Sequence, residues 1–390
     1  MKKILVYSHD TYGLGNLRRM LTICQSLSRA IPDVSILLLS GSPMVQSFRL
    51  TDGLDYIKLP CLTRVAREGY AVKSLRLGIV EGIKLRSDLM LAAARNFQPD
   101  LLLVDKKPFG IKNELKATLE YLKATAPHLK VALILRDILD TPESTVSVWK
   151  SHDYFRVIEE FYDLVLSLGV PEIFDPRHEY QFPDTVANKV KFCGYLRREA
   201  GSKSRAEVRQ ELGLSEQEQL VVVTLGGGED AFAAIATYLQ GIANLPTNHN
   251  IHSLIVTGPE MKEAQQQALC QAIPPHVTMM EFTNDLMSYL GAADVVVSMG
   301  GYNTVCEILS LQKKAIVIPR VRPVQEQLIR AERMSRRGFF QYLHPDTLTA
   351  ENLMQTLHAE LNRTPGALPP LNLNAHQAIA QHVTSLLLTE

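Results

Sequence analysis

Short, wholly apolar runs alternate along the chain with stretches in which apolar residues recur every three or four positions. The apolar runs predict strands, which in the first half lie at 3–8, 34–40, 55–60, 100–105 and 130–136. The periodic stretches predict helices at about 16–30, 72–96 and 110–125. Strands that are apolar throughout are typical of a parallel sheet covered on both faces. The first half is therefore predicted to be a doubly wound α/β domain.

A charged stretch with Gly and Ser at 193–214 interrupts this alternation and predicts a linker. The alternation then restarts, with strands predicted at 219–226, 253–258, 277–282, 293–300 and 314–319. The predicted organisation is two Rossmann-like domains, 1–195 and 196–374, followed by a helix at 375–390 that would pack back across the cleft between them. In such sheets, ligands bind at the carboxyl ends of the strands.

Composition narrows the class of protein. Lys plus Arg and Asp plus Glu both number 41 in the 390 residues, so charge gives no drive toward nucleic acid. The five cysteines form no CxxC pair, which predicts reduced thiols in a cytoplasmic protein. The close histidine pair His249 and His252 has no acidic partner nearby in the sequence, so no metal site is predicted. No apolar run approaches a bilayer span, and any membrane contact would be peripheral.

Glycine turns follow three of the predicted strands. In the segment "SMGGYNTVCEI" at 298–308, Gly300 and Gly301 precede a predicted helix that contains Asn303, Thr304 and Glu307. Glycine allows a ligand to approach the backbone closely. The start of a helix then presents N–H groups to an anion. The alternative is an ordinary tight turn in which Asn303 or Thr304 serves as the helix N-cap.

The first glycine turn, "GLGNLR" at 13–18, lacks a complete dinucleotide fingerprint. Gly13 and Gly15 match its first two glycines, but Arg18 occupies the third position. Neither a P-loop nor a nucleophile elbow occurs. Arg18 and Arg19 lie in the first turn of the predicted helix, where the helix dipole disfavours cations. Either an anionic ligand offsets this cost, or both side chains extend into solvent.

Several short motifs at 281–338 resemble, in their order and spacing, the MurG-like GT-B glycosyltransferases of family 28. They read F-x-x-D, AD, GG-x-N-T-x-x-E, P and EQ-x-x-x-A, and the start "YSHDTYGLG" is similar to an uncharacterised branch of predicted glycosyltransferases. The resemblance covers nearly the whole chain. It implies two Rossmann-like domains that face each other across a cleft. It also implies metal-independent transfer of a sugar from a nucleotide diphosphate, with a UDP-sugar favoured as co-substrate and no further cofactor.

The resemblance also implies roles for individual residues of the second domain. Glu307 would accept hydrogen bonds from the ribose diol, which suits a carboxylate. Phe282 and the backbone of Thr283 would face the nucleobase. The residues that would hold the diphosphate and the sugar are Gly226, Gly227, Gly228, Gly300, Gly301, Asn303, Thr304, Glu326 and Gln327.

Each of these roles has a structural alternative. Glu307 would merely complement the helix dipole, and Phe282 would belong to the hydrophobic core. The glycines at 226–228 would serve only the turn. Glu326 and Gln327 would form an exposed helix face.

The chain departs from the family pattern at Asn16, where related enzymes usually have a histidine that is a candidate catalytic base. Neutral Asn cannot accept a proton near pH 7, although it is a good helix N-cap. His9, Asp10 and Asp105 remain candidate catalytic groups, together with the Arg-Asp pair at 136–137. The sequence does not choose among them.

The leading function is glycosyl transfer to an unknown acceptor, either a small molecule or a lipid-linked one. The alternatives are hydrolysis or epimerisation of the nucleotide sugar, and a subunit that binds a nucleotide sugar without turnover. A mildly basic stretch at 62–88 fits peripheral contact with a membrane, although a solvated helix face is the alternative. The sequence gives no indication of oligomeric state.

Overall fold

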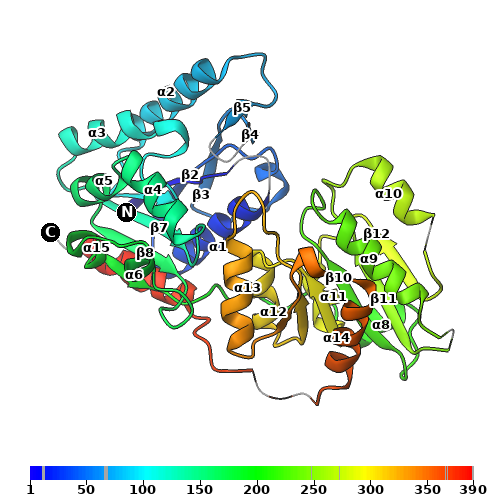
Figure 1. The fold of residues 1–390 in the computed structure, drawn as a ribbon. Coiled ribbons are helices and arrows are strands. Elements are labelled where there is room, and N and C mark those ends of the chain that lie inside the picture. The colour runs from blue at the N-terminus through cyan, green and yellow to red at the C-terminus, as the bar shows by residue number, and fades with distance from the viewer. Residues whose placement is uncertain are drawn as a thin grey trace. The chain divides into compact units, whose positions relative to one another are not determined.

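The chain folds into two compact units (Figure 1), which are considered separately below. The structure is a computed structural model and describes residues 1–10, 14–65, 69–246, 248–271, 273–364, 366 and 368–388. The first unit comprises Met1–Leu196 and the C-terminal segment from Asn372, and the second comprises Arg197–Leu371.

The first unit is built on a parallel sheet in the order β3-β2-β1-β6-β7-β8-β9. Its strands are β1 (Lys2–Tyr7), β2 (Val34–Ser40), β3 (Leu54–Lys58), β6 (Leu101–Asp105), β7 (Lys130–Arg136), β8 (Leu164–Leu168) and β9 (Val190–Phe192). The five strands predicted from apolar runs are present. The central strand β6 is buried along its whole length, as expected when helices cover both faces of a sheet.

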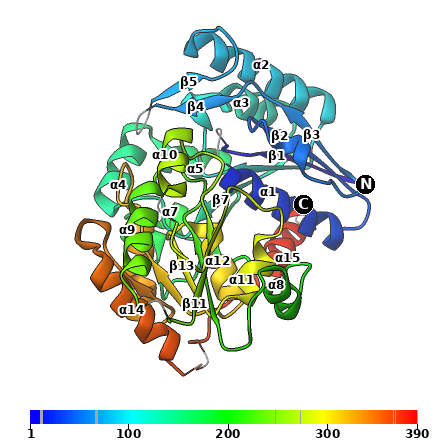
Figure 2. The same cartoon turned by 90° about the vertical axis from the view of Figure 1, so that its right-hand side faces the viewer.

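The helices of the first unit are α1 (Leu14–Ala30), α2 (Ile79–Phe97), α3 (Lys116–Thr125), α4 (Pro142–Ser151), α5 (Tyr154–Phe161), α6 (Pro176–Glu179), α7 (Asp184–Ala187) and α15 (Ala375–Leu388). The 3₁₀ turns are η1 (Val45–Ser47) and η2 (Ile111–Asn113). Helix α15 packs against α1 (Figure 2), and an isolated bridge pairs Leu196 with Asn374. The C-terminal segment therefore completes the first unit.

The prediction for the stretch at 62–88 is wrong in part. An antiparallel hairpin, β4 (Leu62–Arg64) and β5 (Tyr70–Val72), precedes α2, which begins only at Ile79. Arg86 does not belong to a solvated face, because it is fully buried. Its guanidinium donates to both carboxylate oxygens of Glu114, at 2.5 and 2.8 Å, and Glu114 also accepts from the Tyr7 hydroxyl. A buried charge is tolerated only when it is paired and hydrogen-bonded in this way.

The second unit contains a second parallel sheet, in the order β12-β11-β10-β13-β14-β15. Its strands are β10 (Gln219–Thr224), β11 (Ile251–Val256), β12 (Val277–Met280), β13 (Val295–Ser298), β14 (Ala315–Val317) and β15 (Gln341–Tyr342). The five predicted strands are present. The short β15 was not predicted, because two residues give no periodicity.

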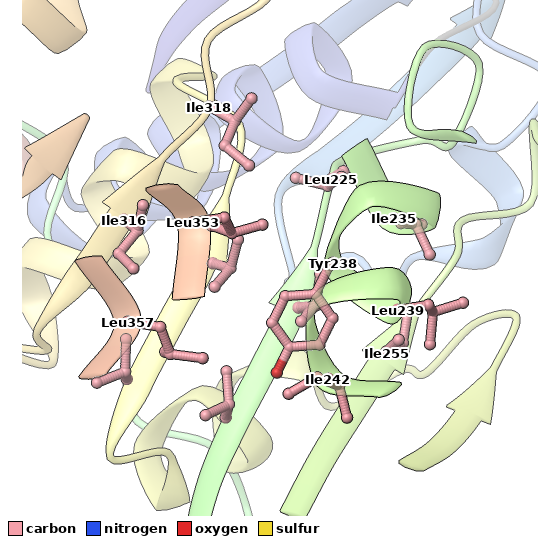
Figure 3. Packing of buried hydrophobic residues seen from close by; sticks show 14 of the residues in the cluster. Leu225, Ile235, Tyr238, Leu239, Ile242, Ile255, Ile316, Ile318, Leu353 and Leu357 are labelled. Atoms are coloured by element: carbon pink, nitrogen blue, oxygen red, sulfur yellow. The ribbon is translucent and has the colours of Figure 1, made fainter. Parts of the chain in front are cut away.

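The helices of the second unit are α8 (Arg205–Glu211), α9 (Phe232–Ala243), α10 (Glu263–Cys270), α11 (Leu286–Ala292), α12 (Tyr302–Ser310), α13 (Glu326–Arg336) and α14 (Ala350–Asn362), with the 3₁₀ turn η3 (Pro345–Thr347). Side chains of α9 and α14 pack on the sheet in one hydrophobic cluster (Figure 3), for example Leu239 and Leu353. The Tyr238 hydroxyl within this cluster lies 2.7 Å from Ser253 Oγ, so its polar atom is satisfied.

Within the part of the chain that the structure describes, no helix is both long and apolar enough to cross a bilayer.

Candidate functional site

Two of the predicted glycine turns lie at the switch point of the second sheet. Strand β10 pairs with β11 on one side and with β13 on the other. From β10 the chain continues outward to β11 and β12, and from β13 it continues in the opposite direction to β14 and β15. The turns that follow β10 and β13 therefore flank the point where open α/β sheets bind ligands.

The turn after β10 contains one closely packed glycine and one glycine that faces open space. Gly226 and Gly228 have φ values of 74° and 101°, which favour glycine. A Cβ on Gly228 would lie 2.5 Å from the Thr257 carbonyl oxygen, whereas a Cβ on Gly226 would meet no atom within 4 Å. Helix α9 then begins at Phe232, and Ala231 at its N-cap offers no side-chain bond. The first N–H groups of α9 are thus suited to an anion.

The turn after β13 has two glycines with different reasons to be glycine. A Cβ on buried Gly300 would lie 2.9 Å from the carbonyl oxygen of Gln327, so close packing excludes a side chain there. Gly301 has an ordinary φ of −63° and is itself the N-cap of α12, with Gln327 Nε2 the nearest atom to a Cβ at 4.0 Å. The alternative that Asn303 caps α12 is wrong, because its Oδ1 accepts from an Arg198 guanidinium nitrogen at 2.8 Å.

The other residue proposed as a cap, Thr304, lies within α12 and is half-buried, and so it does not cap the helix either. Further along α12, Glu307 is only 1% exposed. A carboxylate at this depth needs polar partners, which the dipole alternative by itself does not provide.

The start of α13 is buried, so the alternative of an exposed helix face for Glu326 and Gln327 is wrong. Glu326 accepts from Arg330 at 3.0 Å, and Arg330 also donates to the Gly300 carbonyl oxygen at 2.6 Å. The Gln327 side chain accepts from the Arg320 backbone N–H at 3.0 Å. Arg330 was not predicted, although its i,i+4 spacing from Glu326 was a usable signal.

Phe282 follows β12 and is 54% exposed, so the alternative that it belongs to the core is wrong. Thr283 is half-buried, and its hydroxyl accepts from the Asp285 backbone N–H at 3.1 Å. An exposed aromatic side chain at the carboxyl edge of the sheet suits stacking on a base. The nucleobase role of both residues stays a prediction.

In the first unit the candidate catalytic residues lie at the switch point between β1 and β6. Gly13 lies outside the described residues. Gly15 is exposed and Arg18 half-buried, both in the first turns of α1. Arg19 fits neither predicted explanation, because it donates to both oxygens of Asp105, at 2.8 and 3.0 Å, in a buried ion pair. Asp105 is thus engaged as a structural counter-ion.

His9 and Asp10 are both buried but differ in electrostatics. Burial, then the positive charges of Lys106 and Lys107, and further Arg86 and Arg136, lower the pKa of His9 well below its usual value. Its ring is therefore neutral near pH 7. Burial raises the pKa of Asp10 to about 6, although its oxygens accept 2.6 Å bonds from the hydroxyl of Ser40 and the backbone N–H of Gly41.

Asn16 does not serve as the N-cap of α1, because the helix already begins at Leu14. Its side-chain amide donates to the carbonyl oxygen of His9 at 2.5 Å. Asn16 therefore holds the backbone that carries His9.

Residues 220–382 match the family model described as the Glycosyltransferase family 28 C-terminal domain. An uncharacterized glycosyltransferase of Methanopyrus kandleri is 21% identical over 233 residues, which cover 59% of this chain and 62% of that protein. The UDP-N-acetylglucosamine–N-acetylmuramyl-(pentapeptide) pyrophosphoryl-undecaprenol N-acetylglucosamine transferase of Fusobacterium nucleatum is 23% identical over 198 residues, which cover 50% of this chain and 52% of that protein. The matched region is thus less than two thirds of either relative.

Solved structures share the fold along 99% of the chain. MurG of Acinetobacter baumannii has a TM-score of 0.57 at 14% identity, with 99% of that chain covered. A putative UDP-N-acetylglucosamine 2-epimerase from Listeria monocytogenes has a TM-score of 0.64 at 10% identity, with 98% of that chain covered. At such identities the likeness shows the fold alone. It confirms the predicted fold, and the family match confirms the resemblance that the motifs at 281–338 indicate.

The two glycines before α12 are expected to respond differently to the same substitution. Gly300→Ser should destabilise the second unit by about 1–3 kcal/mol, because its side chain must displace the backbone of Gln327. Gly301→Ser should change stability by less than about 0.5 kcal/mol, since Ser is a good N-cap and the space is open. Urea unfolding followed by circular dichroism compares the two, and an equal loss in both variants would contradict this account of the turn.

Proposed function

We propose that this chain is a glycosyltransferase that uses a nucleotide-diphosphate sugar, because its residues 220–382 match the family 28 C-terminal domain and its fold resembles that of MurG. The observation that carries the proposal is the pair of glycine turns at the switch point of the second sheet. Each turn leads into a helix, α9 or α12, whose start has no side-chain cap. A UDP-sugar is the favoured donor, as in the name of the Fusobacterium nucleatum relative.

The diphosphate would lie against the starts of α9 and α12. Each start contributes N–H groups and the positive end of a helix dipole. The same groups would stabilise the charge that develops on the departing diphosphate, so the transfer needs no metal ion in this proposal. Gly226 and Gly301, where a Cβ would meet little or nothing, would allow the phosphates to approach the backbone.

The nucleoside would lie beside α12 and the end of β12. Glu307 would accept hydrogen bonds from the ribose diol, as the family resemblance implies. Phe282, which is exposed, would stack on the nucleobase. Glu326 and Gln327, whose side chains are fixed by Arg330 and the Arg320 backbone, would bond the hydroxyls of the donor sugar.

The first unit would bind the acceptor, with His9 as the catalytic base. Its neutral ring is able to take a proton from a hydroxyl. Protonation of the His9 ring is disfavoured by burial and by the positive charges of Lys106, Lys107 and Arg136. An anionic group on a substrate would offset the effect of these charges. Asp105 would position His9 by accepting from its backbone N–H, and Asn16 would do so by donating to its carbonyl oxygen.

A lipid-linked acceptor would require contact with a membrane surface, and the region around α2 of the first unit suits it. Exposed apolar side chains occur on α2, in the segment before it and in the β4–β5 turn, namely Val65, Leu75, Leu77, Val80, Leu85 and Leu89. Exposed Lys73, Arg76 and Lys84 lie among them in the chain. Apolar side chains beside cations are typical of proteins that lie on anionic membranes.

A thermal-shift panel of UDP, GDP, TDP and ADP sugars tests the donor class. A ligand at about 100 times its Kd should add roughly 2.7 kcal/mol of stability. We expect the UDP-sugars to raise the melting temperature most. Stabilisation by none of the four would contradict a nucleotide-sugar site.

Glu307→Gln should weaken UDP binding by about 10- to 150-fold, through loss of a charge-assisted bond of about 1.5–3 kcal/mol. Glutamine keeps the volume of this buried side chain. Glu360→Gln is the matched control, because Glu360 is also buried on a helix of the second unit, α14, but pairs with Arg363 at the end of that helix. Calorimetry that gives folded Glu307→Gln the wild-type affinity would reject the ribose role.

His9→Gln should lower donor turnover by about 10²–10⁴-fold, because a general base is lost. UDP affinity should stay unchanged, since the donor residues belong to the second unit. Asn16→Ala should lower turnover only modestly, through positioning. Release of UDP is measured over a panel of soluble and lipid-linked acceptors, with circular dichroism to check folding. Turnover within about threefold of wild type in His9→Gln would assign the base elsewhere.

The same assay separates the alternative functions. Release of free sugar without any acceptor would indicate a hydrolase, and an altered sugar on the nucleotide would indicate an epimerase. Donor binding without turnover in the wild type, together with turnover in Asn16→His, would identify a binding subunit on a transferase fold.

Leu77→Asp/Val80→Asp should weaken binding to phosphatidylglycerol vesicles by about 10-fold or more, because two exposed apolar side chains are replaced by charges. Ile273→Asp is the control, since Ile273 is an exposed apolar residue of the second unit. Co-sedimentation measures the bound fraction. Equal vesicle binding by both variants and wild type would contradict membrane contact through α2.

A further inference from the structure

Three metal-ligating side chains meet at the amino-terminal edge of the second sheet, opposite the edge with the glycine turns. Glu218 directly precedes β10, His252 is the second residue of β11, and His276 directly precedes β12. One ligand atom from each side chain lies within 4.8 Å of the others. No acidic residue is near His249 and His252 along the chain, but the parallel register brings Glu218 to His252, so the prediction of no metal site rested on sequence distance alone.

Two side chains of this trio, Glu218 and His252, are held in place by neighbours. The Glu218 Oε2 atom accepts from the backbone N–H and the hydroxyl of Ser215, both at 2.8 Å, while Oε1 lies 3.9 Å from His276 Nδ1. The Nε2 atom of His252 lies 3.0 Å from Thr278 Oγ1. Partners of this kind orient the ligands of metal sites.

The trio is also accessible from solvent. The side chains of His276 and Glu218 are 43% and 22% exposed, so an ion can reach them. Metal ligation by these residue types uses the carboxylate and the imidazole nitrogens, which the trio supplies.

The donor set selects the class of ion. Two imidazoles and one carboxylate suit Zn²⁺ and neighbouring first-row metals, with water at the remaining position. Mg²⁺ and Ca²⁺ prefer oxygen ligands. The neighbouring His249 is not counted as a ligand, because its Nδ1 accepts from the backbone N–H of Ile251 at 3.2 Å.

We infer that Glu218, His252 and His276 form a Zn²⁺-type metal site that joins the starts of β10, β11 and β12. The site belongs to the second unit alone and lies at the edge of the sheet opposite the starts of α9 and α12. Its role is to stabilise this edge of the sheet, since an ion that binds only the folded state favours folding. It is independent of the proposed glycosyl transfer.

The test is calorimetric titration of the tag-free, metal-stripped protein with Zn²⁺, and with Co²⁺ for its visible absorption. We expect one ion per chain with Zn²⁺ and none with Mg²⁺. His276→Asn is the first variant, because Asn tolerates the left-handed conformation of His276 (φ 63°) and removes the imidazole. His252→Gln and Glu218→Gln remove the other ligands. In each variant the Zn²⁺ affinity should fall by more than the about 10–100-fold expected when an outer-shell partner is removed.

His344→Asn is the matched control, because His344 lies 4.0 Å from Asp346 in the same unit but has no place in the trio. It should bind Zn²⁺ like wild type, and UDP affinity should be unchanged in His276→Asn. No Zn²⁺ binding by wild type at millimolar concentration, or wild-type binding by His276→Asn, would overturn the proposal. Neither result would bear on the donor site, whose failure appears only in the UDP titration.

Discussion

Parallel pairing on both sides of β10 is the constraint on which the second unit depends. Thr224 at the end of β10 is level with Val256 of β11 and Ser298 of β13, so the turns after these strands leave the sheet together. The same register aligns the strand starts at the other edge, where Leu220 is level with His252. One set of strand pairs thus brings the glycine turns together at one edge and the metal trio together at the other.

The strands were largely predictable because a buried parallel strand needs a continuous apolar run, and the sequence displays such runs directly. The environment of individual side chains was not. Whether Glu326 is exposed depends on the packing of α13 against Gly300, which periodicity within one helix does not report. Likewise, the partner of His252 is Glu218, and only the strand register makes these two residues neighbours. Long-range packing therefore accounts for most of the wrong alternatives.

The carboxyl edge of the first sheet also suits an anionic ligand, but through charged side chains and not through open glycine turns. Asp105 neutralises Arg19, and Glu114 neutralises Arg86, so these two cations are balanced by acids inside the unit. Burial, and then the positive charges of the half-buried Lys106 and Lys107, depress the pKa of His9. An edge of this kind attracts anions, and an anion that arrives there would relieve the electrostatic cost of protonating His9.

The environment of His9 changes the interpretation of Asn16. An amide cannot accept the proton that a histidine would take, and so the substitution argues against catalysis at that position. However, its bond to the His9 carbonyl oxygen ties the start of α1 to the end of β1, next to the neutral imidazole of His9. Under the proposed function, the base would thus have moved from the helix to the strand end. The helix would still hold the base in place, through the bond that Asn16 donates to the His9 backbone.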